Sequence, residues 1–252
     1  MTLEYSRIVR RLSAYLPFLA AALIFGSLYM VSRNSGDLPY SVAVIGAVVL
    51  AASGALCIQA LLRGSYVASG AMPALLVAGA TFAFLFLENA VLRIIVAAAV
   101  SILFLVLVRH LAESAKLEAA AAELRALSEW SALVALVGLA AGLLGAITFL
   151  NWDVWLSTLV FAAVAVYASF ILARLGRVVG WLVPAAVSLL LVQGFIVIAG
   201  LPTSHWVGAG VLGAVSYLLF SILTVMPFGS LKRAIVSSGA ICAVLLATAR
   251  WR

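Results

Sequence analysis

The sequence predicts an all-α membrane protein, a polytopic transmembrane helical bundle of eight or nine spans with a cytoplasmic N-terminus. Of its 252 residues, 67% are hydrophobic and 9% are charged, and the mean hydropathy is +1.28. A soluble domain carries about 25% charged residues. No Asp, Glu, Lys or Arg falls in the middle of an apolar run. Because runs of about 20 apolar residues can cross a bilayer, residues 1–252 are expected to form a single transmembrane domain.

Turn-forming residues divide the chain into nine apolar runs. The expected spans are 12–31, 41–62, 71–87, 91–109, 131–150, 154–173, 179–199, 205–226 and 234–249. The first run follows a basic stretch but is longer than the apolar region of a signal peptide, so an uncleaved span is expected. The ninth run is short, and a re-entrant or interfacial segment is the alternative to a ninth crossing.

The basic residues predict the orientation. Eleven of the 15 Lys and Arg residues fall on the N-terminal side of this threading, and four fall on the other side. Cytoplasmic loops carry such an excess, so the N-terminus is placed inside. The same residues are spread over many short connections, which argues against a nucleic-acid surface. The expected location is a cell membrane, taken to be a bacterial inner membrane, with the lipid bilayer as the surrounding partner.

The connection at 110–130 is the longest polar one and is rich in Ala, Glu and Leu, which favours a cytoplasmic amphipathic helix. One interpretation is that the two flanking spans extend into the cytoplasm and fold back as a hairpin. The other is a docking helix for a protein partner.

The turns on the outer side carry most of the polar residues that could do chemistry. These residues are Glu88, Asn89, Arg93, Asn151, Asp153 and His205. Two acids and a histidine could bind a divalent metal or transfer protons. An ion pair between Glu88 and Arg93 and an N-cap role for Asp153 are the structural alternatives. Because no HExxH or DxxD motif is present, no catalytic residue, metal or cofactor is assigned.

The two hairpins at 81–109 and 148–174 resemble each other. Each has an acid and an Asn near its turn and an apolar run that ends in Arg. Constraints common to any helical hairpin explain this likeness, and so would a parallel internal repeat.

Gln193 lies about two turns below the outer end of the run 179–199, amid apolar residues. A glutamine in lipid needs a hydrogen-bond partner, so its side chain is expected to face the bundle or a cavity. Gln59, Ser188, Thr81 and Ser101 are possible companions. Gln193 would then join helices or contact a ligand.

Small residues predict where helices approach closely. They occur in two of the runs, at Gly138, Gly142 and Gly145 and at Gly208, Gly210 and Gly213. Contacts within the chain and contacts between subunits both fit this pattern. Cys57 and Cys242 lie in apolar runs without partners at metal-ligand spacing and are interpreted as small buried side chains.

Three short patterns resemble a family of uncharacterised multi-span bacterial membrane proteins. They are the turn at 86–89, the turn at 151–155 and Gln193 followed by an outer loop with Pro202 and Trp206. The resemblance covers about 82–225. It implies a multi-span bundle and no substrate or catalytic residue.

Three functions follow from these observations. The first is an integral membrane scaffold or accessory subunit that packs against a protein partner, or against further copies of itself, within the bilayer. The alternative is a carrier or flippase for an apolar or lipid-linked substrate, with broken helices at Pro73, Pro184 or Pro227 as its gate. The third is an intramembrane enzyme that uses the outer Glu, Asp and His residues. The absence of charge at mid-span favours a non-enzymatic role.

Overall fold

A computed structural model describes residues 2–33, 67–114, 121–175, 178, 180–223 and 228–249. These residues form eight α-helices and no strand. The helices are α1 (Thr2–Arg33), α3 (Val67–Phe84), α4 (Ala90–Ser114), α5 (Ala121–Leu150), α6 (Val154–Leu175), α7 (Leu182–Ala199), α8 (His205–Leu223) and α9 (Phe228–Thr248). The expected span 41–62 lies outside the described residues.

Six of the described helices, α4 to α9, are long and apolar enough to cross a membrane. Helices α1 and α3 contain shorter apolar stretches, Pro17–Ser32 and Leu75–Phe84. An α-helix suits this environment because each backbone N–H and C=O group is satisfied within the segment. The chain is therefore an all-helical, membrane-embedded protein. The count of eight or nine spans and the side of the N-terminus remain predictions.

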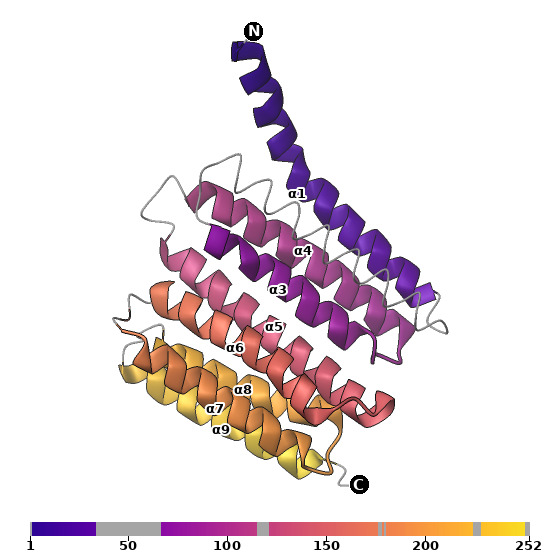
Figure 1. Ribbon diagram of the computed structural model, residues 1–252, viewed down its shortest axis with the longest axis vertical. Coiled ribbons are helices and arrows are strands. Elements are labelled where there is room, and N and C mark those ends of the chain that lie inside the picture. Colours follow the sequence, from indigo (N-terminus) through magenta and orange to yellow (C-terminus); the bar gives the residue numbers. More distant parts are fainter. Residues whose placement is uncertain are drawn as a thin grey trace.

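The helices lie side by side in an order that follows the chain closely (Figure 1). Helices α1, α4 and α3 form one half, and α6, α7, α8 and α9 form the other, with α5 between them. The turns 85–89, 151–153 and 200–204 lie at the same end of the bundle, hereafter the turn end. The sequence predicts that this end faces the outside.

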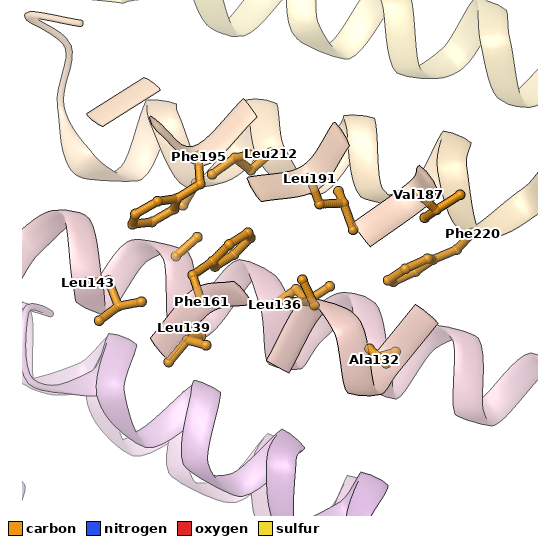
Figure 2. Close-up of a cluster of buried hydrophobic side chains, with 14 of the residues drawn as sticks. Ala132, Leu136, Leu139, Leu143, Phe161, Val187, Leu191, Phe195, Leu212 and Phe220 are labelled. Atoms are coloured by element: carbon orange, nitrogen blue, oxygen red, sulfur yellow. The ribbon is translucent and has the colours of Figure 1, made fainter. Parts of the chain in front are cut away.

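Each half has its own hydrophobic core. In the first half, Ile24 and Leu28 of α1 pack with Phe84 of α3 and Phe104 of α4. In the second half, the core is built from α5, α6, α7 and α8. Its centre is a pair of stacked rings, Phe161 and Phe195, whose centroids are 4.6 Å apart (Figure 2). Both rings are fully buried, so this pair fixes α6 against α7.

The two halves are joined where α3 and α5 cross at backbone contact. A methyl group added to Gly138 would lie 2.6 Å from the carbonyl oxygen of Gly79, and one added to Gly79 would lie 2.1 Å from that of Ala135. Real Cβ atoms do not approach an oxygen so closely, so hydrogen is the one side chain that fits at either position. Close approach of this kind supplies the dispersion contacts that hold helices together in lipid.

The remaining glycines that the sequence singles out also face other helices of the same chain. An added methyl group at Gly142 or Gly145 would collide with Phe82 or Phe86. Three more glycines lie on α8: Gly208 faces Ile198 and Leu144, Gly210 faces Leu245, and Gly213 faces Val137. These glycines therefore permit close contacts between helices of the same chain.

Helix α9 is one unbroken helix that runs antiparallel to α8, and by length and composition it could cross a membrane. Gly210, near the start of α8, faces Leu245, near the end of α9. Cys242 is half-buried, with its Sγ 4.0 Å from the carbonyl oxygen of Val211. Only 11% of Leu231–Thr248 is buried, because α8 is the helix against which α9 mainly packs.

The segment 110–130 does not form a separate helix in its described part. Residues 110–114 complete α4, and residues 121–130 begin α5. The helical pattern of this segment therefore comes from α4 and α5, which both extend beyond their apolar runs, as the hairpin interpretation expects. Residues 115–120 lie outside the described residues.

The α3–α5 crossing generates a prediction about stability. Gly138→Ala should destabilise the protein by about 1–3 kcal/mol, the usual cost of overpacking. Gly239→Ala is the control, because nothing lies within 4 Å of an added methyl group there. Alanine is the better helix former by up to about 1 kcal/mol, so this control should be neutral or slightly stabilising. Thermal unfolding in detergent measures both variants, and equal stability of the two would contradict the backbone contact.

Candidate functional site

The polar residues that the sequence places on the outer side all lie at the turn end. Glu88, Asn89 and Arg93 belong to the turn between α3 and α4 and to the first turn of α4. Asn151 and Asp153 form the turn between α5 and α6, and His205 begins α8. The chemistry of each residue follows from its position at a helix terminus.

Asn89 and Asp153 are helix N-caps. The side-chain oxygen Oδ1 of Asn89 accepts hydrogen bonds from the backbone N–H groups of Val91 and Leu92, at 2.9 and 3.2 Å. Asp153 Oδ1 accepts one from the backbone N–H of Leu156 at 2.9 Å. These bonds satisfy N–H groups that have no partner within the helix. The two hairpins thus share one device, an Asx residue that starts the returning helix.

Asn151 directly follows the last residue of α5. Its φ of 55° lies in the left-handed region, which Asn tolerates better than most residues. The residue is exposed. Its role is to reverse the chain direction between α5 and α6 within three residues.

Glu88 and Arg93 do not form the ion pair that the sequence suggests as their structural role. Among the described residues, no acidic group lies within ion-pair distance of Arg93. The Nε–H of Arg93 instead donates to the backbone carbonyl oxygen of Leu87, and the side chain is half-buried. Glu88 is exposed. The arginine therefore fastens the end of α3 to the start of α4.

His205 lies in an aromatic cluster that joins both hairpins to α8. Its ring centroid is 5.4 Å from that of Phe149 and 6.1 Å from that of Phe86, in edge-on arrangements. Phe86 and Phe149 also stack on each other at 6.1 Å, and Trp206 lies 5.1 Å from His205. The imidazole therefore packs among apolar rings, while the two carboxylates at this end are exposed.

The described residues do not assemble the outer acids and histidine into a metal site. Within that part of the chain, no group of three or more His, Cys, Asp and Glu residues could hold a metal ion. Five of the six residues begin, end or fasten helices at the turn end, and Glu88 is exposed.

Gln193 does not face the bundle, contrary to what the sequence predicts. Its side chain is exposed on α7. Around it on the same face lie four exposed apolar residues, Leu189, Leu190, Ile196 and Val197. These five residues are hereafter the α7 face.

The expected companions of Gln193 bond to their own helices. The hydroxyl group of Thr81 donates to the carbonyl oxygen of Val77, four residues earlier. The hydroxyl group of Ser101 donates to that of Ala97, also four residues earlier, at 2.8 Å. Ser188 donates to the carbonyl oxygen of Ala185 at 2.9 Å. Gln59 lies outside the described residues. Among the residues that are described, none forms a hydrogen bond with the Gln193 amide.

Sequence reasoning missed an apolar groove between α4 and α5. It has a volume of about 690 Å³ and is lined by residues of α3, α4 and α5, with Trp206 at the turn end. Ala80, Ala83 and Gly138 are the small lining residues of α3 and α5. The run of small residues in α3 is the sequence feature that comes nearest to predicting this groove. A single sequence does not tell whether a neighbouring helix fills the space beside small residues.

Comparisons with known proteins identify no relative. No protein-family model matches the chain, and neither a curated protein nor a solved structure matches it. The resemblance read from the turns at 86–89 and 151–155 and from Gln193 therefore adds no family assignment, and function is argued from the geometry.

The capping geometry generates a second prediction. Asp153→Ala should lower the free energy of unfolding by about 1 kcal/mol, because it removes the acceptor for a backbone N–H at the start of α6. Asp153→Asn should retain nearly all of the stability, because an amide oxygen caps as well as a carboxylate does. Denaturant or thermal unfolding measures both variants. A large loss in Asp153→Asn would show that the charge itself has a function.

Proposed function

We propose that this chain is an integral membrane scaffold or accessory subunit that packs against a protein partner within the bilayer. The observation that carries the proposal is the exposed Gln193 on an otherwise apolar face of α7. Proposed with it are a multi-pass threading of eight or nine spans, a cytoplasmic N-terminus and a bacterial inner membrane. The absence of a described chemical site is consistent with this role.

The depth of Gln193 gives the proposal its physical basis. The residue lies six positions before the end of α7 at Ala199. At 1.5 Å per residue this places its Cα about 9 Å below the helix end, about one third of the way along the 18-residue helix. A glutamine side chain is too short to reach the head-group region from there. An amide in hydrocarbon is stabilised by a hydrogen bond to another helix, so the α7 face is proposed as the contact surface.

A second copy of the chain is the partner that fits this surface best. The glutamine amide has both donors and an acceptor, so two copies can pair their Gln193 side chains across a two-fold axis. The apolar residues on either side of Gln193 would then pack against their equivalents. A different subunit with a polar residue at the same depth is the alternative within this proposal.

The carrier or flippase remains a second candidate, favoured by the groove between α4 and α5. Two features weigh against it. Helix α3 continues through Pro73, and Pro184 lies in the first turn of α7, so neither proline breaks a helix. The lining residues of the groove on α4 run from Leu92 to Leu103, which is about two thirds of the candidate span Ala90–Val108 and not its whole length. Pro227 lies outside the described residues.

An oligomer assay tests the scaffold proposal. Gln193→Leu should weaken self-association by about tenfold, which corresponds to the one or two kcal/mol that an interhelical hydrogen bond contributes in a membrane. Leu159→Ala is the control, because this exposed residue lies on α6 and outside the α7 face. Native mass analysis in mild detergent, over a dilution series, gives the oligomeric state. A wild type that is always a lone monomer without a protein partner would overturn the proposal.

A further inference from the structure

The groove between α4 and α5 is open to the surroundings along one side. Two of its lining residues, Leu92 and Val134, are 44% and 36% exposed. Ala99, a third lining residue, is also exposed. In a membrane, these rims face lipid. The interior is lined by aliphatic side chains and by the small residues Ala80 and Ala83 of α3. The groove therefore suits a flexible apolar chain that enters from the bilayer.

The groove is elongated along the helix axes, starting near the turn end. On α4 the lining runs from Leu92, near the turn end, to Leu103. Eleven residues of helix rise correspond to about 16 Å. Half of a hydrocarbon core of about 30 Å is about 15 Å. On α5 the lining reaches Leu133, which lies 17 residues or about 25 Å from the end of that helix at Leu150, so the groove is at least as long as one leaflet is deep and has room for a single acyl chain.

The mouth of the groove carries a fixed positive charge. Leu87 and Leu92 line the groove at the turn end, and the Arg93 Nε–H donates to the carbonyl oxygen of Leu87. This bond uses one of the five N–H donors of the guanidinium group. The other four have no acceptor among the described residues. Guanidinium binds phosphate through pairs of such donors.

Trp206 and Glu88 complete the surroundings of the mouth. Trp206 lines the groove and is 39% exposed, which is typical of an aromatic residue at head-group depth. Glu88 is exposed and follows Leu87 in sequence, so the turn has no net charge. A free anion gains little from such a turn. A phosphate that arrives with an acyl chain gains the burial of the chain as well.

From this arrangement we infer that the groove is a binding site for one membrane phospholipid. One acyl chain lies between α4 and α5, and the phosphate is held at Arg93. The site does not depend on the α7 face, which lies on a different helix in the other half of the bundle. Its role is to hold a lipid in place.

Two variants separate the acyl-chain site from the head-group site. Ala99→Phe places a ring in the groove from an exposed position of α4, and Ala163→Phe makes the same change at an exposed position of α6. Arg93→Gln removes the charge at the mouth, and Arg174→Gln removes an exposed charge at the last turn of α6. Neither control residue lines the groove.

The experiment is native mass spectrometry of the full chain after stepwise delipidation in detergent. The wild type and both controls should retain one phospholipid per chain. Ala99→Phe should lose it, and Arg93→Gln should bind added phosphatidylethanolamine or phosphatidylglycerol about tenfold more weakly, as expected for one charged hydrogen-bonded contact. Adding the same phospholipid should raise the unfolding temperature of the wild type and not that of Ala99→Phe.

Three results would overturn the inference. The first is stoichiometric lipid on folded Ala99→Phe. The second is inorganic phosphate competing with the lipid at equal concentration, which would point to an anion site without a lipid chain. The third is a change of oligomeric state in Ala99→Phe without a change in bound lipid, which would make the groove a protein contact. Gln193→Leu should bind lipid like the wild type, so failure of the oligomer proposal is recognised separately.

Discussion

The backbone contact between α3 and α5 at Gly79 and Gly138 is the constraint on which the rest of the structure depends. Because lipid tails are as apolar as leucine, burial of apolar surface does not drive helices together in a bilayer. Van der Waals contacts between closely packed helices contribute to their association instead. The two hydrophobic cores lie on either side of this crossing. The small residues that permit the crossing also leave α4 without a close neighbour along part of α5, and the groove is the space that results.

Apart from the buried hydroxyl groups of Ser169, Ser216 and Ser238, which have no hydrogen-bond partner among the described residues, two kinds of polar side chain stand out. The first kind satisfies the backbone, either as caps at Asn89 and Asp153 or as hydroxyl groups that bond within their own helix, as at Thr81 and Ser101. Gln193 and Arg93 keep hydrogen-bonding capacity that the described residues leave unused. The proposed protein interface and the inferred lipid site rest on these two residues. Both proposals therefore come from the same physical rule, that polar groups in an apolar medium require partners.

The turn end shows how a group of acids, amides and a histidine can be assembled for structural reasons. Three chain reversals meet there, and each needs residues that stop one helix and start the next. The aromatic cluster around His205 and Phe149 then fastens the reversals together. The hydrogen bonds of Asn89, Asp153 and Arg93 show that these three members of the group serve helix termini.

The sequence by itself determined the helical class, the approximate helix ranges and the N-cap role of Asp153, because hydropathy and local turn chemistry depend on residues close together in the chain. It also marked the glycines of α5 and α8 as packing positions. The tertiary structure alone decided that Gly138 meets Gly79, that Gln193 faces outward and that a groove lies beside Leu92 and Val134. Each of these depends on how one helix is rotated against another. In α3 to α8 nearly every position is apolar, so the sequence carries little periodicity to specify which side of a helix faces inward.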